Sequence, residues 1–115
     1  MRVAIIGICT DHKGIDAALK EVIEELNEES IVLCEDDISG VGLAVRTTGM
    51  KVANKYCGRA DMLLGYDKMY EDRRQHILDT ADKIYVIWDG IEEFTKATIE
   101  KLKTMDKLYK VIMVE

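Results

Sequence analysis

The stretch ADKIYVIWDGIEEFTKATI, residues 81–99, decides the fold. Its run IYVIW is apolar and aromatic, which is typical of a strand buried on both faces. Asp89 and Gly90 end this run, and a short acidic loop follows. Thr95 is then predicted to cap a helix over 96–105. A strand that leads directly into a helix is the repeating unit of a parallel α/β sheet.

The remainder of the chain repeats this alternation. Apolar runs predict strands over 3–8, 31–34, 60–66, 83–88 and 109–114, and amphipathic segments predict helices over 15–26, 43–56, 71–80 and 96–105. The pattern predicts an α/β protein, a Rossmann-like three-layer sandwich whose five-stranded, mostly parallel sheet has the order 3-2-1-4-5. The topological switch point would lie between the strands that begin at Val3 and Lys83.

Length and composition narrow the class of protein. A chain of 115 residues predicts one domain, 1–115, and 48% hydrophobic residues are enough for a buried core. The net charge of −6, with no basic run, argues against binding to nucleic acid or to an anionic membrane. No apolar run approaches the roughly 20 residues of a membrane span. Because no signal peptide precedes the first strand and the cysteines are an odd, scattered set, we expect a cytoplasmic protein with reduced thiols.

Three loops are expected to form one cleft at the carboxyl edge of the sheet: 9–14, 35–42 and 89–95. In the last of these, Asp89 could accept hydrogen bonds from a ribose hydroxyl, or it could form an Asx turn with Gly90. Trp88 and Phe94 could stack on a base, or they could belong to the core. These loops are where the sequence predicts a small-molecule site.

Residues 39–42, SGVG, resemble a glycine-rich phosphate turn at a helix N-terminus. The alternative is a plain turn, because Val45 stands where the dinucleotide motif has its third glycine. Arg46 and Thr47 follow as donors that could reach an anion or could lie on an exposed helix face.

Arg73 and Arg74 are predicted near the start of a helix, where positive charge opposes the helix dipole. Their charge could be offset by the neighbouring Glu71 and Asp72 or by an anionic ligand. Both interpretations remain open from the sequence.

Cofactor, metal and nucleophile signals are weak. His12 and His76 have no partner at metal-ligand spacing, so we expect no metal and no cofactor. Cys9 ends the first strand, where a nucleophile could lie, but no base is identifiable and a buried thiol is the alternative. No catalytic residue is therefore predicted.

Several motifs resemble the SLOG superfamily, a Rossmann-like group that includes DprA, the LOG phosphoribohydrolases and the YspA/YpsA-related proteins. The resemblance is to the YspA-like branch, in which an opening "KVAIIGSR" corresponds to RVAIIGIC at 2–9. The other matching motifs are Ser39-Gly40, ANKYC at 53–57, Arg73 before Ala81-Asp82, Trp88-Asp89-Gly90 and Thr95.

The chain also departs from that family. Phe94 replaces the glycine of a "GT" pair, Glu92 replaces a serine, Arg74 replaces an asparagine and Met50 replaces an aspartate. Ala97 and Thr98 stand where the hydrolases carry a glutamate. The phosphate-binding motif is therefore degenerate, and hydrolysis of the family's type is not expected.

The resemblance implies non-catalytic binding of a nucleotide-derived small molecule, such as an ADP-ribose-like or cyclic nucleotide signal. The protein would act as a sensor or as a sequestering sponge of the viral anti-defence kind, and it would form a homo-oligomer. The candidate ligand-binding residues are Gly7, Cys9, Thr10, Ser39, Gly40, Gly42, Arg46, Thr47, Arg73, Trp88, Asp89, Gly90 and Thr95.

Two alternatives remain open. One is a nucleotide N-glycosidase or phosphoribohydrolase-type hydrolase, for which Asp11, Asp36, Asp37 and Asp89 are the available carboxylates. The other is a degenerate fold that acts as a protein-interaction module.

Overall fold

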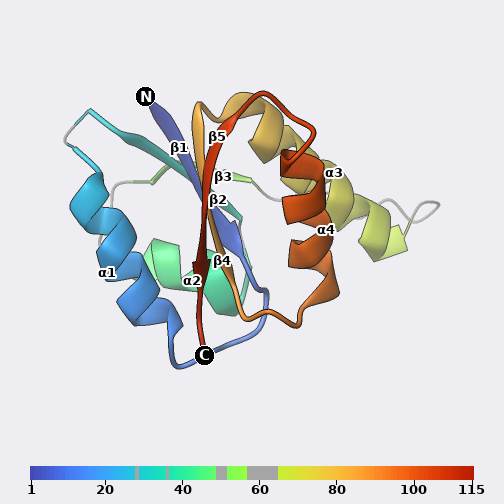
Figure 1. The fold of residues 1–115 in the computed structure, drawn as a ribbon, viewed down its shortest axis with the longest axis horizontal. Coiled ribbons are helices and arrows are strands. Elements are labelled where there is room, and N and C mark those ends of the chain that lie inside the picture. The colour runs from blue at the N-terminus through green and yellow to red at the C-terminus, as the bar shows by residue number, and fades with distance from the viewer. Residues whose placement is uncertain (28, 36, 49–51, 57–64) are drawn as a thin grey trace.

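A computed structural model describes residues 1–27, 29–35, 37–48, 52–56 and 65–115. Within these residues, strands and helices alternate along the chain (Figure 1). The elements are β1 (Arg2–Gly7), α1 (Ile15–Glu25), β2 (Ile31–Glu35), α2 (Gly40–Thr47), β3 (Val52–Tyr56), α3 (Gly65–Thr80), β4 (Lys83–Trp88), α4 (Glu93–Leu102) and β5 (Leu108–Met113).

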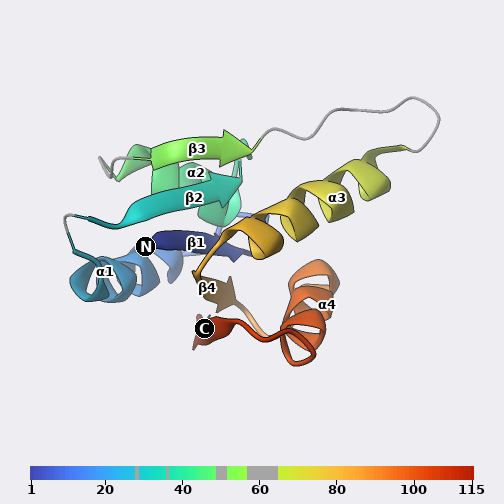
Figure 2. The same cartoon turned by 90° about the horizontal axis from the view of Figure 1, so that it is seen from above.

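The strands form one sheet in the order β3-β2-β1-β4-β5, and every described pair is parallel. Figure 2 shows β3, β2, β1 and β4 lying one after another. β1 aligns Val3 with Val32 of β2 and with Lys83 of β4. The predicted α/β class is confirmed, and the arrangement is compatible with a Rossmann-like fold.

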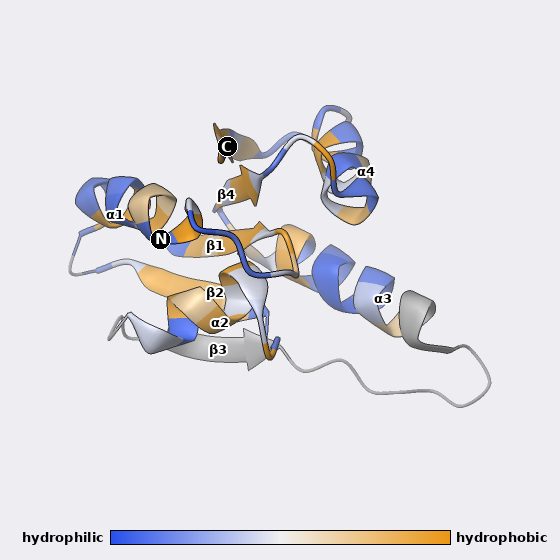
Figure 3. Ribbon diagram, turned by 90° about the horizontal axis from the view of Figure 1, so that it is seen from below, coloured by the Kyte–Doolittle hydropathy of each residue, from blue (hydrophilic) through white to orange (hydrophobic). Residues whose placement is uncertain are grey.

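Helices cover both faces of this sheet. In Figure 1, α1 and α2 lie on one side of the strands, and α3 and α4 lie on the other. Figure 3 shows the hydrophobic colouring concentrated on β1 and β4, with hydrophilic colouring along the outer sides of α1 and α4. This distribution follows from the apolar runs of the strands and the one-sided apolar stripes of the helices.

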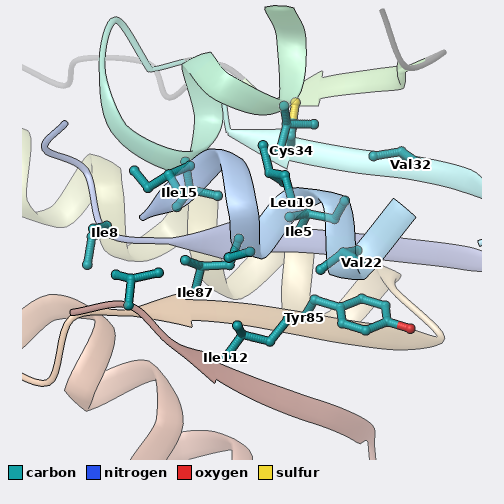
Figure 4. Close-up of a cluster of buried hydrophobic side chains, with 14 of the residues drawn as sticks. Ile5, Ile8, Ile15, Leu19, Val22, Val32, Cys34, Tyr85, Ile87 and Ile112 are labelled. Carbon is teal, nitrogen blue, oxygen red and sulfur yellow. The ribbon is translucent and has the colours of Figure 1, made fainter. Parts of the chain in front are cut away.

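Each face has its own buried core. On the α1 side, Ile5, Leu19 and Tyr85 belong to one cluster, and Figure 4 shows these side chains filling the space between α1 and the sheet. On the α3 and α4 side, Ile6 and Leu102 belong to a second cluster. Full burial of an aliphatic side chain of this size contributes about 1.5–3 kcal/mol to stability.

Two sequence-based predictions in the middle of the chain were wrong. The helix predicted over 43–56 ends at Thr47, and 52–56 instead form β3, which pairs with β2. The strand predicted over 60–66 was also wrong at its end, because residues 65 and 66 begin α3. Residues 60–64 lie outside the described residues. No helix in the described part of the chain is long and apolar enough to cross a membrane.

Candidate functional site

Three loops meet at the carboxyl edge of the sheet. The hydroxyl of Ser39, after β2, donates to the carbonyl oxygen of Cys9, after β1, at 2.5 Å. The backbone N–H of Cys9 donates to Oε2 of Glu92, after β4, at 2.8 Å. The structure therefore brings together the three loops in which the sequence predicted a cleft.

A buried cluster of four charged side chains lies beneath these loops: Glu35, Asp37, Arg73 and Arg74. One guanidinium nitrogen of Arg73 lies 3.1 Å from Oε2 of Glu35 and 2.7 Å from Oδ1 of Asp37, and one of Arg74 lies 2.5 Å from Oε1 of Glu35. The side chains of Arg73, Arg74 and Glu35 are only 3%, 2% and 2% exposed. Buried charges of this kind are tolerated only when they are paired, and here the two signs balance.

Arg74 joins four elements of the fold. Besides Glu35, it donates to the carbonyl oxygen of Gly7 at 2.7 Å and to the hydroxyls of Thr95 and Thr98 at 3.3 and 3.2 Å. Its guanidinium also stacks on the ring of Phe94, 4.1 Å from the ring centre. Burial by itself lowers the pKa of Arg74. The charge and the hydrogen bond of Glu35, together with the charge of Glu92, act in the opposite direction, and the pKa is raised overall. The arginine is therefore a fixed cation that connects β1, β2, α3 and α4.

The prediction that Arg73 and Arg74 stand near a helix start was wrong. Both lie in the interior of α3, which begins at residue 65. Their carboxylate partners include Glu35 and Asp37, at and after the end of β2. The offsetting charge is thus supplied by a distant part of the chain.

A carboxylate occupies the N-terminus of α4. Glu92 is the N-cap residue, so the prediction that Thr95 caps this helix was wrong. The buried Thr95 hydroxyl instead donates to Oε1 of Glu92 at 2.5 Å, while Oε2 accepts the Cys9 N–H. The carboxylate makes no capping hydrogen bond to its own helix, and it joins the loop after β1 to the first turn of α4 instead.

The N-terminus of α2 has a similar arrangement. Oδ1 of Asp11 accepts the N–H of Gly40 at 3.1 Å. Gly40 has φ +71°, and a Cβ there would lie 2.4 Å from the carbonyl oxygen of Ile8. A Cβ at Gly42 would lie 2.4 Å from the carbonyl oxygen of Glu35. Close packing therefore requires glycine at both positions. This requirement agrees with the interpretation of residues 39–42 as a plain turn.

The loop after β4 is an Asx turn. Oδ1 of Asp89 accepts the N–H groups of Glu92 and Ile91, both at 2.9 Å, and these bonds lower the pKa of Asp89. Gly90, with φ +82°, completes the turn. The indole N–H of Trp88 donates to the carbonyl oxygen of Glu92 at 3.0 Å, and the ring packs against both cores. Asp89 and Trp88 thus hold the loop in shape.

The remaining predicted residues lie at the margin of the cleft. A guanidinium nitrogen of Arg46 donates to the carbonyl oxygen of Asp37, and the exposed Thr47 hydroxyl bonds to the carbonyl oxygen of Leu43 in its own helix. Thr10 is exposed beside Cys9, and Gly7 lies where β1 approaches β4 closely. Asp36, Met50 and Cys57 lie outside the described residues.

Cys9 is unsuited to act as a nucleophile at neutral pH. Burial raises the pKa of its thiol to about 12, and the carboxylates of Glu35 and Glu92 raise it as well, against the opposing effect of Arg74. Because the thiolate is the reactive species, a thiol of this pKa is almost entirely unreactive at pH 7.

One cavity is lined in part by Arg74 of the charged cluster, and a second lies on the other face of the sheet. The first has a volume of about 580 Å³ and lies between α3 and α4, lined by Tyr70, Glu71, Arg74, Leu78, Glu93, Phe94, Ala97, Thr98 and Lys101. The second, of about 470 Å³, lies between α1 and α2 beside Asp11, His12, Leu43 and Thr47. The lining of the first cavity includes the rings of Tyr70 and Phe94 and several polar groups. The described lining of the second cavity contains no Phe, Tyr or Trp.

Sequence reasoning missed Glu35 and the role of Arg74, and it did not consider Tyr70 or Lys101 as ligand contacts, although it weighed Phe94 as a residue that could stack on a base. One signal was present: a carboxylate ends the apolar run of 31–34, and an unexplained arginine pair lies elsewhere in the chain. Buried charges require opposite partners, so these two features could have been matched.

Comparison with protein-family models, with curated proteins and with solved structures finds no match to this chain. Among the described residues, no group of three or more His, Cys, Asp or Glu side chains is arranged to hold a metal ion.

Proposed function

We propose that this chain binds a nucleotide-derived small molecule without turning it over, as a sensor or a sequestering sponge in the cytoplasm. On this proposal it is a Rossmann-like domain of the SLOG type with a degenerate phosphate motif. The observation that carries the proposal is the cavity of about 580 Å³ between α3 and α4. Its volume lies within the range of roughly 300–1,000 Å³ that is usual for small-molecule sites.

The lining of this cavity suits a nucleoside. The ring of Phe94 is an aromatic surface held in place by Arg74, and Tyr70 is held similarly by Arg73, 4.9 Å from the ring centre. Aromatic rings stack on bases with little regard to base identity. The hydroxyl of Thr98 and the carboxylates of the lining offer acceptors for ribose hydroxyls.

The lining of the same cavity includes a cation other than the two arginines that stack on its aromatic rings. Lys101 lies one turn beyond Ala97 on α4 and is exposed. Its ammonium group would pair with a phosphate. In contrast, the backbone N–H groups of Cys9 and Gly40 already donate to the carboxylates of Glu92 and Asp11. The favoured ligand is therefore one in which the nucleoside supplies the main contact and the phosphate is peripheral.

The binding role is favoured over catalysis by the state of the available carboxylates. Asp37 pairs with Arg73, Asp11 accepts a backbone N–H, and Asp89 accepts two. The N–H bonds from Glu92 and Ile91 lower the pKa of Asp89, which makes this carboxyl group a poor proton donor. With the pKa of Cys9 at about 12, no described group in the cleft combines the features of a nucleophile and a general acid.

A second candidate function is a protein-interaction module. It is favoured by one observation: the backbone N–H groups of Cys9 and Gly40 already donate to the carboxylates of Glu92 and Asp11. On this alternative, the fold has lost its ligand and retains only its surface.

The first experiment is mass spectrometry of small molecules released by denaturing the purified protein. It is combined with thermal shift measurements against NAD, ADP-ribose, cyclic ADP-ribose variants and cyclic dinucleotides. A ligand at 100 times its Kd adds about 2.7 kcal/mol to the free energy of unfolding, which a thermal shift detects. Recovery of an intact nucleotide supports the proposal, and recovery of a cleaved product contradicts the non-catalytic role.

Two variants locate the site. Phe94→Leu removes the ring but keeps most of the volume, and we expect it to weaken binding at least tenfold. Thr47→Ala lies in the second cavity and is the matched control, with unchanged affinity expected. No ligand and no shift with any compound would leave the interaction module as the better account.

A further inference from the structure

Strand β5 forms an open edge of the sheet. It is last in the strand order, and in the described part of the chain it pairs only with β4. The N–H of Val114 donates to the carbonyl oxygen of Trp88 at 2.9 Å. Since alternate residues of a strand direct their backbone groups to opposite sides, Tyr109, Val111 and Met113 direct their N–H and C=O groups away from β4.

This edge is apolar and lacks the usual protection. Leu108, Tyr109 and Met113 are 65%, 37% and 55% exposed. Edge strands are normally protected by outward lysines. Here the ammonium group of Lys110 lies 3.4 and 3.1 Å from carboxylates of α1, and that of Lys107 bonds to the carbonyl oxygens of Asp79 and Ala81. Both lysines are thus held against their own subunit.

The covering helices also leave this edge open. α1 and α4 both contact β4, the neighbour of β5. In Figure 2 the end of β5, marked C, lies at the margin of the strands, beyond β4. A strand added alongside β5 would continue the sheet without displacing either helix.

We infer that β5 pairs in antiparallel fashion with β5 of a second copy of this chain, with Val111 opposite Val111 on a two-fold axis. In this register Tyr109 lies opposite Met113 of the second copy. All outward N–H and C=O groups of Tyr109, Val111 and Met113 then find partners, which makes about six hydrogen bonds. Tyrosine and methionine also form a favourable cross-strand pair.

Charge argues against the neighbouring register. A register centred on Lys110 would instead place two lysines opposite one another, which is unfavourable. The segment is thus complementary to itself when reversed, and this favours a second copy over an unrelated extended peptide.

The test is the mass of the purified chain in solution, measured by light scattering after gel filtration over a range of concentrations. We expect a dimer that Val111→Pro weakens at least tenfold. The N–H that proline removes points outward, so the monomer loses no hydrogen bond to β4. Circular dichroism checks that the variant is folded.

Charge variants test the register directly, and they decide the question if Val111→Pro does not fold. Tyr109→Lys with Met113→Lys places like charges opposite each other and should give a monomer. Tyr109→Glu with Met113→Lys places opposite charges together and should keep the dimer. Ile38→Lys is the control, since Ile38 is 94% exposed on the loop after β2 and should not change the mass.

A wild-type chain that is monomeric at every concentration would overturn the inference and leave β5 as an edge for an extended peptide. A dimer that survives both Val111→Pro and the two lysines would also overturn it, because the contact would then lie elsewhere. Neither result depends on whether a nucleotide binds between α3 and α4.

Discussion

Oε2 of Glu92 accepts a hydrogen bond from the backbone N–H of Cys9 at 2.8 Å, although the two residues are 83 positions apart. The carboxylate lies at the N-terminus of α4, where it also accepts the Thr95 hydroxyl. It joins the loop after β1 to the first turn of α4 without a hydrogen bond to the N–H groups of that helix. The carboxylate therefore occupies two donors that an anion from solution could otherwise use, the Cys9 N–H and the Thr95 hydroxyl.

Replacing Glu92 should open an anion site. In Glu92→Ala, the Cys9 N–H and the Thr95 hydroxyl lose their acceptor, and we expect the free energy of unfolding to fall by about 1–3 kcal/mol. Added sulfate or phosphate should restore part of this loss in the variant and have less effect on the wild type. Urea unfolding with and without the anion measures both.

The control is Glu93→Ala, which removes an exposed carboxylate in the first turn of the same helix. If the anion stabilises Glu93→Ala and Glu92→Ala equally, the carboxylate of Glu92 is not what excludes it.

Arg74 should be among the most sensitive positions in the chain. Arg74→Met keeps much of the side-chain volume but removes the cation from Glu35, Thr95 and Thr98. Breaking a buried ion pair costs about 3–5 kcal/mol because the remaining charge is uncompensated. Urea denaturation should show a loss of this size.

A double-mutant cycle separates this pair from simple loss of packing. Glu35→Gln combined with Arg74→Met should cost less than the sum of the two single changes, since neither charge is then left alone. Strict additivity would mean that Arg74 acts through its contacts other than Glu35.

Gly40 should tolerate alanine poorly. Its φ of +71° strains any L-residue, and the new Cβ would lie 2.4 Å from the carbonyl oxygen of Ile8. We expect Gly40→Ala to lower the free energy of unfolding by more than the roughly 1 kcal/mol of left-handed strain alone. Gly90→Ala is the matched control, because Gly90 has a similar φ of +82° but its Cβ would meet only the methyl end of Met113 at 3.2 Å. Equal losses in thermal unfolding would argue against the backbone clash at Gly40.

The thiol of Cys9 should make stability fall at alkaline pH. Its pKa is raised in the folded protein from 9.0 to about 12. Above pH 9 the unfolded chain releases this proton while the folded chain keeps it, so the stability contributed below pH 9 is lost progressively as pH rises toward 12. Urea unfolding between pH 8 and 11 should show this decline in the wild type and a smaller one in Cys9→Ser.

Thiol labelling gives an independent measurement. In a Cys57→Ser background at pH 8, Cys9 should react with iodoacetamide far more slowly than a free cysteine, because little thiolate is present. Rapid labelling of Cys9 would contradict the raised pKa and reopen its candidacy as a nucleophile.

Local pattern was sufficient for most of the secondary structure and insufficient for the segments predicted over 43–56 and 60–66. The run at 83–88 and the amphipathic stripe of α1 coincide with the elements observed. In contrast, VANKY at 52–56 fits a helix by the spacing of its apolar residues from Val45, and it lacks the alternation of apolar and polar residues that predicts a strand. Pairing with β2 selects the strand, and that pairing is a contact with a distant segment.

The sequence predicted which loops meet, but it did not predict the cavity between α3 and α4, whose described lining contains none of the candidate ligand-binding residues. The three loops were expected at one edge because parallel strands end together. Whether Asp89 served a ribose or a turn depended on where the N–H groups of Ile91 and Glu92 point, and the structure supplies that direction. The same holds for Arg73, whose partners could not be chosen from its neighbours in the chain.

The sequence by itself determined the α/β class, because the alternation of apolar runs and amphipathic stripes is a local property that burial acts on directly. Only the tertiary structure decided which charges meet. Arg74 and Glu35 are 39 positions apart, and Cys9 and Glu92 are 83 apart. A buried charge or a helix N-terminus requires a partner but does not specify one, so the choice depends on which side chains the packed sheet and helices bring within hydrogen-bonding distance.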